Sequence, residues 1–525
     1  MRLQRLAAAI ALLTACGTSG SNGTTGGSTA DAGDAGGTIP DATGPLGDGA
    51  SDAPSSVPDG GARGDGGDGG KPLATHPVTS RFFGMHTNTY GNGIPFGTER
   101  LWDSGTAWSQ IQTAAMTYDF SSVQSRVADA QKYGFDLLYT FGRTPPFLAA
   151  TSTVKCDYGN DGQCNPPDDV ATDGTGADAH VKAFWTAFMN AMCTGTAPNK
   201  TCGPLKYFEM WNEPNADQFW SGTYAQLARM SADATAVIKS QCASCTVLTP
   251  GVACGGDGYH ANGDAGQCEV WMAAYLKAWQ ALGNLPDAGA WHPYPAHTNV
   301  SPSPFPETNV SSWDVCPGAD AGGDMPSCTC KAGFVPNPEC QHSVVDQITV
   351  LRDVFDANGL AGKPMIATEG SWNEEPNLPD PDQQAAWLAR WYLVQAGAGI
   401  EASCWYAEDA PENNGGWGRL LTSADAGAAG PNAAGVAYQQ VYGWLVGGAI
   451  GACSASGTLW SCPAVDAKGD AGVILWDTAQ TCAGGHCSTR DVPVAASFTR
   501  VSDLAGSTSP VSGMVSVGAK PVFVR

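Results

Sequence analysis

Two glutamates lie at the ends of strand-like segments and could act together. Glu213 belongs to an Asn-Glu-Pro sequence that follows segment 206–211, and Glu369 directly follows segment 364–368. One carboxylic acid can protonate a leaving oxygen while a second carboxylate attacks the neighbouring carbon or activates water. Their environments must then hold the two pKa values apart. The pair fits the cleavage of a glycosidic bond.

Other strand ends carry polar and aromatic residues that could bind a sugar. Arg100 lies in segment 100–102, and His292 and Tyr294 lie at the end of segment 290–292. Either Arg100 or His292 could instead have a purely structural role. Aromatic rings stack on the apolar faces of sugars, so we expect Trp372 and Trp405 to line the cleft.

The sequence contains no pattern typical of a metal or cofactor site in this part of the chain. The histidines at 86, 260 and 297 are scattered without the spacing of metal ligands. No glycine-rich phosphate loop follows the first strand-like segment, and Gly-X-Ser-X-Gly is absent from the sequence. We therefore expect neither a metal nor a cofactor.

Asn-Glu-Pro after one strand, with a second glutamate three strands later, resembles clan A of the glycoside hydrolases. Segment 96–103, Phe-Gly-Thr-Glu-Arg-Leu-Trp-Asp, is similar to family 39 proteins of that clan. The resemblance implies a retaining O-glycoside hydrolase of poly- or oligosaccharides, with Glu213 as acid/base and Glu369 as nucleophile. It also implies contacts to the sugar or the nucleophile for Asn212, Arg100, His292, Tyr294 and Trp405.

Two other functions remain open for such a site. A barrel of this kind could bind carbohydrate at a cell surface without catalysing a reaction. The same pair of glutamates could also perform transglycosylation if the site excludes water.

The elements that must position these residues alternate between strand-like and helical patterns. Strand-like segments are 82–86, 100–102, 136–140, 206–211, 246–248, 290–292, 364–368 and 402–406. Helical periodicity occurs in 123–133, 181–192, 224–238, 270–282, 344–355, 383–396 and 436–445. Such alternation predicts parallel strands with right-handed crossovers, and thus an α/β fold, a (β/α)8 TIM barrel over residues 76–445. The first unit lacks a clear helix.

Residues 446–525 lack long helical patterns and contain four strand-like segments, 473–476, 495–498, 514–517 and 521–524. They predict a small C-terminal β-sandwich. This domain could be a stabilising appendage or a sugar-binding module.

The first 75 residues predict export and a tether. Residues 1–16 combine two arginines, a short apolar run and Leu-Thr-Ala-Cys, which resembles a bacterial lipobox ending at Cys16. We expect lipidation of Cys16 and anchoring to a cell envelope membrane, although an ordinary signal peptide with a chance cysteine would look similar. Residues 17–75 are rich in Gly, Ala, Ser, Thr, Asp and Pro, which predicts a disordered linker.

The 18 cysteines are consistent with an oxidising compartment. Apart from Cys16, most have a partner close in sequence: 156/164, 193/202, 242/245, 254/268, 453/462 and 482/487. Cys316, Cys328, Cys330 and Cys340 form a further cluster, for which a zinc site is the alternative to disulfides. Pairing leaves Cys404 as the odd thiol.

The formal net charge of −24 argues against binding to nucleic acid or to anionic lipid headgroups. We expect a carbohydrate substrate, membrane contact only through the lipid anchor, and a monomer.

Overall fold

The computed structural model describes residues 75–151, 155–156, 162–254, 268–295, 303, 305–307, 343–410, 416–422 and 430–525. The predicted signal segment with Cys16, the linker up to residue 74 and the Cys316–Cys340 cluster lie outside these residues. Across the described ranges, no helix is both long and apolar enough to cross a membrane.

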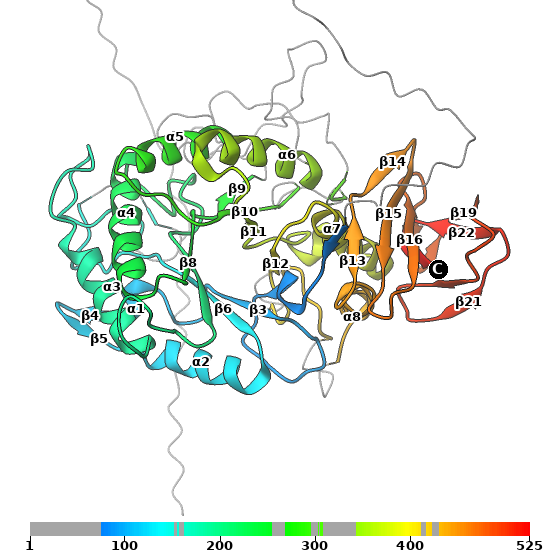
Figure 1. The fold of residues 1–525 in the computed structure, drawn as a ribbon, viewed down its shortest axis with the longest axis horizontal. Coiled ribbons are helices and arrows are strands. Elements are labelled where there is room, and N and C mark those ends of the chain that lie inside the picture. The colour runs from blue at the N-terminus through cyan, green and yellow to red at the C-terminus, as the bar shows by residue number, and fades with distance from the viewer. Residues whose placement is uncertain are drawn as a thin grey trace, which may run out of the picture. The chain divides into compact units, whose positions relative to one another are not determined.

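A parallel sheet forms the central part of the fold (Figure 1). In sheet order the strands are β8, β7, β6, β3, β2, β12, β11, β10 and β9, and every pair is parallel. A parallel bridge from Leu248 to Ala288 brings the two ends of the sheet together, so the sheet closes. The bounds are β2 (Phe83–Met85), β3 (Thr98–Leu101), β6 (Asp136–Thr140), β7 (Leu205–Glu209), β8 (Thr246–Leu248), β9 (Val252–Ala253), β10 (Gly289–His292), β11 (Met365–Ala367) and β12 (Ala402–Trp405). The prediction of a TIM-like barrel is confirmed.

Helices follow most of these strands and cover the barrel (Figure 1). They are α2 (Ser121–Tyr133), α3 (Ala179–Met192), α4 (Tyr224–Gln241), α5 (Cys268–Gln280), α6 (Val344–Phe355), α7 (Pro381–Gly397) and α8 (Ala433–Leu445). Local signals fix their ends: Thr223 caps α4, Asp380 caps α7 ahead of Pro381, and Gly134 ends α2 at φ 83°. As expected, no helix connects β2 to β3.

Short elements that the sequence patterns did not predict lie in the connections. They are α1 (Trp108–Ile111), the hairpin of β4 (Gln112–Ala114) and β5 (Thr117–Tyr118), and the helical turns η1 (Ser80–Phe82), η4 (Asp356–Leu360) and η5 (Glu375–Asn377).

Alternation along the strands gives the barrel interior two layers. The lower layer is an apolar cluster that includes Leu138, Tyr207, Ala290, Ile366 and Ala402. Since side chains on one face of a strand recur every two residues, the next inward positions are 140, 209, 292, 368 and 404. Four of these five are polar or ionisable and one is a cysteine: Thr140, Glu209, His292, Thr368 and Cys404. The strands thus place a polar layer at their carboxyl ends.

The C-terminal region forms antiparallel sheets, which fit the predicted β-sandwich. The large sheet runs β1, β13, β15, β16, β23, β20 and β21, with β14 beside β15; β19 and β22 form a ribbon and β17 and β18 a hairpin. The bounds are β1 (Thr75–Pro77), β13 (Ala449–Gly451), β14 (Ser454–Ser456), β15 (Leu459–Val465), β16 (Ala471–Asp477), β17 (Cys482–Ala483), β18 (His486–Cys487), β19 (Thr489–Pro493), β20 (Arg500–Ser502), β21 (Thr508–Pro510), β22 (Met514–Gly518) and β23 (Val522–Val524). The predicted strand at 495–498 is wrong: Phe498 N–H donates to Ala495 O at 3.0 Å in a turn.

The large sheet packs on both faces. Ile474, Trp476 and Phe523 belong to the same apolar core as the barrel, and the Trp444 ring of α8 lies 5.9 Å from that of Phe523. The alternate residues, including Leu475, form a smaller core with the β19–β22 ribbon. The segment before the barrel also joins this sheet, because β1 pairs with β13.

Six local disulfides are present among the described cysteines, at 156–164, 193–202, 242–245, 254–268, 453–462 and 482–487. Cys404 is free and buried. These pairs match the cysteines that are close in sequence.

Candidate active site

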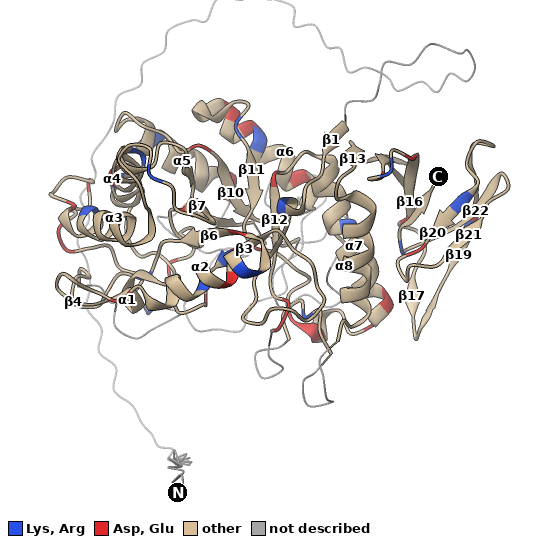
Figure 2. Ribbon diagram, turned by 60° about the horizontal axis from the view of Figure 1, so that its bottom comes forward, with Lys and Arg blue, Asp and Glu red and all other residues tan. Residues whose placement is uncertain are grey.

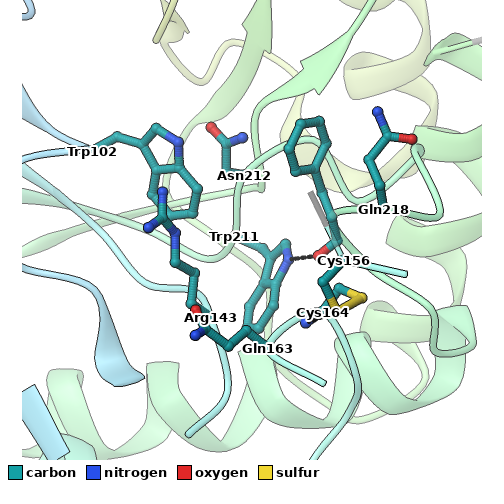
Figure 3. A pocket seen from close by; sticks show the side chains of 9 residues that line it. Trp102, Arg143, Cys156, Gln163, Cys164, Trp211, Asn212 and Gln218 are labelled. Carbon is teal, nitrogen blue, oxygen red and sulfur yellow. Dashed lines mark hydrogen bonds between the residues drawn. A yellow bond between two sulfur atoms is a disulfide. The ribbon is translucent and has the colours of Figure 1, made fainter. Parts of the chain in front are cut away.

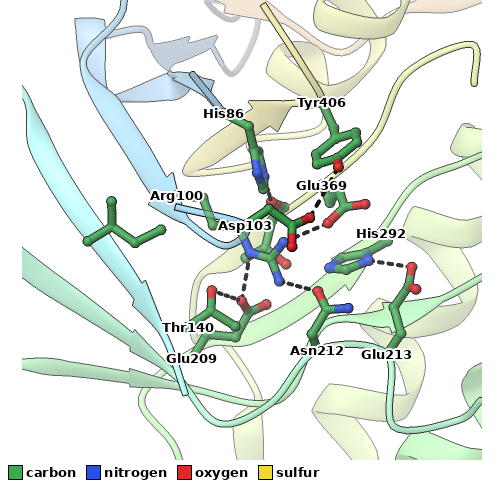
Figure 4. A network of polar contacts seen from close by, with 12 residues as sticks. His86, Arg100, Asp103, Thr140, Glu209, Asn212, Glu213, His292, Glu369 and Tyr406 are labelled. Atoms are coloured by element: carbon green, nitrogen blue, oxygen red, sulfur yellow. Dashed lines mark hydrogen bonds and ion pairs between the residues drawn. The ribbon is translucent and has the colours of Figure 1, made fainter. Parts of the chain in front are cut away.

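Arg100 connects three acceptors in the polar layer of the barrel (Figure 4). Its Nε donates to Glu209 Oε2, its Nη1 to Glu369 Oε2 and its Nη2 to Asn212 Oδ1, each at 2.7 Å. The Arg100 side chain is fully buried. Because a guanidinium presents its donors in a rigid planar fork, this one side chain fixes the relative positions of three neighbours.

Glu369 lies just beyond the end of β11 and is held on both carboxylate oxygens. Arg100 contacts Oε2, and the Tyr294 hydroxyl donates to Oε1 at 2.9 Å. Burial raises the pKa of Glu369, whereas His292, Arg100 and the Tyr294 hydroxyl act in the opposite direction and favour the carboxylate. A carboxylate fixed in this way is suited to act as a nucleophile.

Glu213 projects from the loop that follows β7. It has a left-handed backbone, at φ 43°, and its N–H donates to Gly251 O at 2.8 Å. Asn215, two residues later, ties the loop to Ala253 by donating to its carbonyl at 2.9 Å and accepting from its N–H at 3.1 Å. The loop 212–215 is thus hydrogen-bonded to the segment that contains β9. The left-handed backbone of Glu213, which is not a glycine, is a sign of a functional constraint.

The Glu213 side chain meets His292 at the end of β10. Glu213 Oε1 lies 2.7 Å from His292 Nδ1, and the carboxyl group is 13% exposed. Burial lowers the pKa of His292 to about 4, so its imidazole is neutral near pH 7. A neutral imidazole can either donate to or accept from Glu213, depending on its tautomer.

The two glutamates face one another. One side-chain oxygen of Glu213, one of Glu369 and one ring nitrogen of His292 all lie within 4.8 Å of one another. Figure 4 shows Glu369 above the His292 ring and Glu213 beside it, with Asn212 below. The arrangement allows both carboxyl groups to reach one bond of a bound molecule.

Two further residues complete the site and were missed by the sequence analysis. His86, after β2, lies 3.0 Å from Thr368 O through Nε2, and burial lowers its pKa well below the usual value. Tyr406, after β12, packs edge-on against His86 with ring centroids 4.9 Å apart, and its hydroxyl donates to Asp103 Oδ2 at 3.2 Å. The available signal was their position, because His86 and Tyr406 are the last residues of the strand-like segments 82–86 and 402–406.

The expected roles of Trp372 and Trp405 need correction. Both are buried, at 1% and 0% exposure. Trp405 donates through Nε1 to Gly418 O at 2.6 Å and packs against Trp372 and Trp391. An enclosed ring has no free face for a sugar, so neither tryptophan lines the cleft.

A pocket lies beside Asn212 (Figure 3). Three aromatic residues, one arginine, two amides and one disulfide line it with Asn212: Trp102, Trp211, Phe219, Arg143, Gln163, Gln218 and Cys156–Cys164. The Arg143 guanidinium lies 4.8 Å from the Trp102 ring centroid and pairs with Asp103. The space that these residues enclose is only about 10 Å³, which is roughly the room that one water molecule needs and too little for a sugar ring.

Three groups of described residues place possible metal ligands close together: Cys202, Cys242 and Cys245; Asp168, Asp169 and His180; and Glu213, His292 and Glu369. The cysteines are disulfide-bonded, and His180 is paired with Asp168 at 3.0 Å. In the third group, the Arg100 guanidinium already pairs with Glu369 and opposes a second cation by electrostatic repulsion.

No family model and no curated protein matches this chain. Several solved structures resemble it, however. A family 39 glycoside hydrolase from the gut symbiont Bacteroides cellulosilyticus WH2 has 19% identity and a TM-score of 0.55, over 86% of this chain and 81% of that chain. A monomeric β-xylosidase from Caulobacter crescentus CB15 has 15% identity and a TM-score of 0.54, over 86% and 97%.

A family 44 xyloglucanase from Paenibacillus polymyxa has 13% identity and a TM-score of 0.50, over 86% of this chain and 97% of that chain. At these identities the likeness is one of fold. The barrel therefore has the architecture found in these glycoside hydrolase structures.

Proposed function

We propose that the chain is a retaining O-glycoside hydrolase of poly- or oligosaccharides, with Glu213 as acid/base and Glu369 as nucleophile. One observation carries the proposal: oxygens of the two carboxyl groups lie within 4.8 Å of each other, and Arg100 is bonded to Glu369. Carboxyl groups about 5–5.5 Å apart are typical of retaining enzymes, whereas inverting enzymes leave about 6.5–9.5 Å for a water molecule.

The reaction would proceed by two displacements. Glu369 attacks the anomeric carbon while Glu213 transfers its proton to the departing oxygen, which gives a covalent glycosyl-enzyme. Glu213, now a carboxylate, takes a proton from water, and that water releases the sugar from Glu369. Arg100 and Tyr294 hold the nucleophile in place, and Asn212 and Tyr406 lie where they can contact the sugar.

The structural neighbours suggest where to begin with substrates. Those with printed activities are a β-xylosidase and a xyloglucanase, so aryl β-xylosides, aryl β-glucosides and xyloglucan form a first panel. The described Lys and Arg residues are spread over several elements (Figure 2), which supports a neutral saccharide rather than nucleic acid as the partner. We also propose a monomer.

Replacement of the two glutamates tests the mechanism. Glu369→Gln should lower kcat on aryl glycosides by at least about 10⁴-fold, because no covalent intermediate can form. Glu213→Ala should spare substrates with activated leaving groups in the first step, since these need no proton. A 2-deoxy-2-fluoro glycoside should label Glu369, as peptide mass spectrometry would detect.

Glu375→Gln is the matched control, because Glu375 lies six residues beyond Glu369 and pairs with Arg419 outside the site at 2.8 Å. Full activity of Glu369→Gln would refute the nucleophile role. Binding of polysaccharides without any product would instead favour a non-catalytic carbohydrate-binding barrel, and transfer products in place of free sugar would favour a transglycosylase.

We further propose that the protein is exported and anchored through a lipid on Cys16, with residues 17–74 as a flexible tether up to the start of β1. The six disulfides support an oxidising compartment. Loss of membrane fractionation in a Cys16→Ser variant would test the anchor.

A further inference from the structure

Among the buried polar atoms that lack a hydrogen-bond partner within the described structure, two lie close together in the barrel. They are Nε2 of His292 and Oε1 of Glu209. The other polar atom of each side chain is bonded: His292 Nδ1 lies 2.7 Å from Glu213, and Glu209 Oε2 accepts from Arg100 Nε and from Thr140 Oγ1, both at 2.7 Å. Buried polar groups are rarely left unsatisfied, so this pair calls for an explanation.

The two atoms face the same point in space, beside Gly251. A Cβ on Gly251 would lie 2.3 Å from His292 Nε2 and 2.7 Å from Glu209 Oε1. The φ angle of Gly251 is outside the left-handed region, so its backbone conformation does not require glycine. The two side chains are what exclude a larger residue here. His292 Nε2 and Glu209 Oε1 therefore lie no more than 5.0 Å apart, the sum of these two distances, and Gly251 packs against both.

We propose that Glu209 is a positioning residue for the acid/base: its Oε1, which lies beside Nε2 of His292, favours a proton on Nε2 and thereby selects the tautomer whose Nδ1 accepts from Glu213. This inference rests on the proposed function of Glu213. Which nitrogen of a histidine carries the proton is set by the partner of the other nitrogen. Ionised Glu209 accepts only, and its negative charge favours a proton on the nearer nitrogen.

The chemical consequence concerns the protonation of Glu213. With the proton of His292 on Nε2, the Nδ1 lone pair faces Glu213 and stabilises the protonated acid, which is the form needed for the first displacement. With the opposite tautomer, Nδ1–H would stabilise the Glu213 carboxylate and weaken it as an acid. Glu209 also accepts from Arg100, which donates to Glu369, so the same carboxylate contacts the group that holds the proposed nucleophile.

Glu209→Gln tests this role with little change in shape. Arg100 and Thr140 both donate, so they hold the amide oxygen on their side and turn the NH2 group toward His292, which reverses the polarity at Nε2. In a plot of kcat/KM against pH, the basic limb reports deprotonation of the acid Glu213. We expect this limb to move to lower pH by about one unit. The rate should also fall more for poor leaving groups than for activated ones, a split that a general loss of structure would not produce.

Gly251→Ala would place a Cβ 2.3 Å from His292 Nε2 and 2.7 Å from Glu209 Oε1, so it must push these two side chains apart and should move the same limb in the same direction. Glu401→Gln is the matched control: it makes the same change in a carboxylate that accepts from the Tyr207 hydroxyl at 2.7 Å and has no contact with Glu209, and it should leave the basic limb in place. An unchanged basic limb and leaving-group dependence in both Glu209→Gln and Gly251→Ala would overturn the proposal.

A measurement independent of activity separates this inference from the proposed function. The ¹⁵N chemical shifts of His292 in labelled wild-type protein should report the Nε2–H tautomer, and those in Glu209→Gln the Nδ1–H tautomer. A His292→Gln variant assigns the signals. Nδ1–H in the wild type would refute the role of Glu209 even in an active glycosidase, whereas absence of glycosidase activity would refute the proposed function alone.

Discussion

Arg100 connects the proposed nucleophile Glu369, Asn212 in the loop after β7, and Glu209 in the polar layer of the barrel. Lysine offers a compact ammonium that cannot donate in a planar fork to Glu209, Glu369 and Asn212 together. We predict that Arg100→Lys lowers kcat by about 100-fold or more on aryl glycosides. Arg81→Lys, which alters an exposed ion pair with Asp136, should remain near wild type. Equal kinetics of the two variants would contradict the role of Arg100.

Glu99 gives the stability of the protein a specific pH dependence. Burial raises its pKa from 4.5 to about 8, although Arg126 and Tyr90 favour its ionised form. The folded chain then binds this proton more tightly than the unfolded chain, so Glu99 costs stability increasingly as pH rises from about 4.5 to 8. Glu99→Gln should flatten that decline, which would appear as a Tm higher than wild type by a few degrees at pH 8 and similar at pH 4.5. Parallel melting curves across this range would contradict the prediction.

At the scale of elements, the end of β12 decides which aromatic residue faces the site. Ala402 and Cys404 point into the barrel, so Ser403 and Trp405 point outward; Ser403 accordingly bonds Gln395 on α7. Tyr406 is the next residue, and it lies against His86 and Asp103. A shift of one residue thus exchanges a core position for a site position.

Because Trp405 lies in the core and Tyr406 in the site, we predict opposite effects of replacing these two adjacent residues. Trp405→Phe should lower unfolding stability by about 1–3 kcal/mol and leave kcat/KM within a few-fold of wild type. Tyr406→Ala should leave Tm nearly unchanged and lower kcat/KM by about tenfold or more. Thermal melts and kinetics on the same two proteins would decide, and the reverse outcome would restore Trp405 to the site.

The elements themselves followed from periodicity, and the site followed only in part. Helices and barrel strands can be predicted from the local spacing of apolar residues. Glu213 and Glu369 were found because they follow predicted strands. The fold of 495–498 was missed because a short apolar run is ambiguous when its middle residues are small. His86 and Gly251 were not recognised because their roles depend on which strands, distant in sequence, become neighbours in the closed sheet. The β1–β13 pairing was hidden for the same reason.

At the scale of the whole molecule, the C-terminal sheet and the barrel share buried polar contacts as well as apolar ones. Arg390 of α7 donates to Glu307 Oε1 at 3.0 Å and to Ala519 O at 2.9 Å, and Trp476 Nε1 donates to the same Glu307 oxygen at 3.0 Å. Arg390 and Glu307 side chains are each 1% exposed. The sheet is therefore an integral part of the fold rather than a loosely attached module.

We predict that Arg390→Met lowers the free energy of unfolding by about 3–5 kcal/mol, because it leaves the buried Glu307 carboxyl group without its opposite charge. The double variant Arg390→Met/Glu307→Gln should recover much of that loss. Calorimetry should show one transition for barrel and sheet together in the wild type. Two separate transitions, or additive losses in the double variant, would contradict this coupling.

The position of Cys404 bears on how such a chain can be oxidised correctly. Its Sγ lies 2.6 Å from where a Cβ of Gly84 would be, on the strand that pairs with β12 to join the two ends of the barrel sequence. Burial raises the pKa of this thiol to about 12, which makes it unreactive once the barrel has closed. Before β2 and β12 meet, the same thiol is free to attack any newly formed disulfide. Correct cysteine pairing during oxidative folding therefore requires that β2 and β12 associate faster than the Cys404 thiol exchanges with disulfides formed elsewhere in the chain.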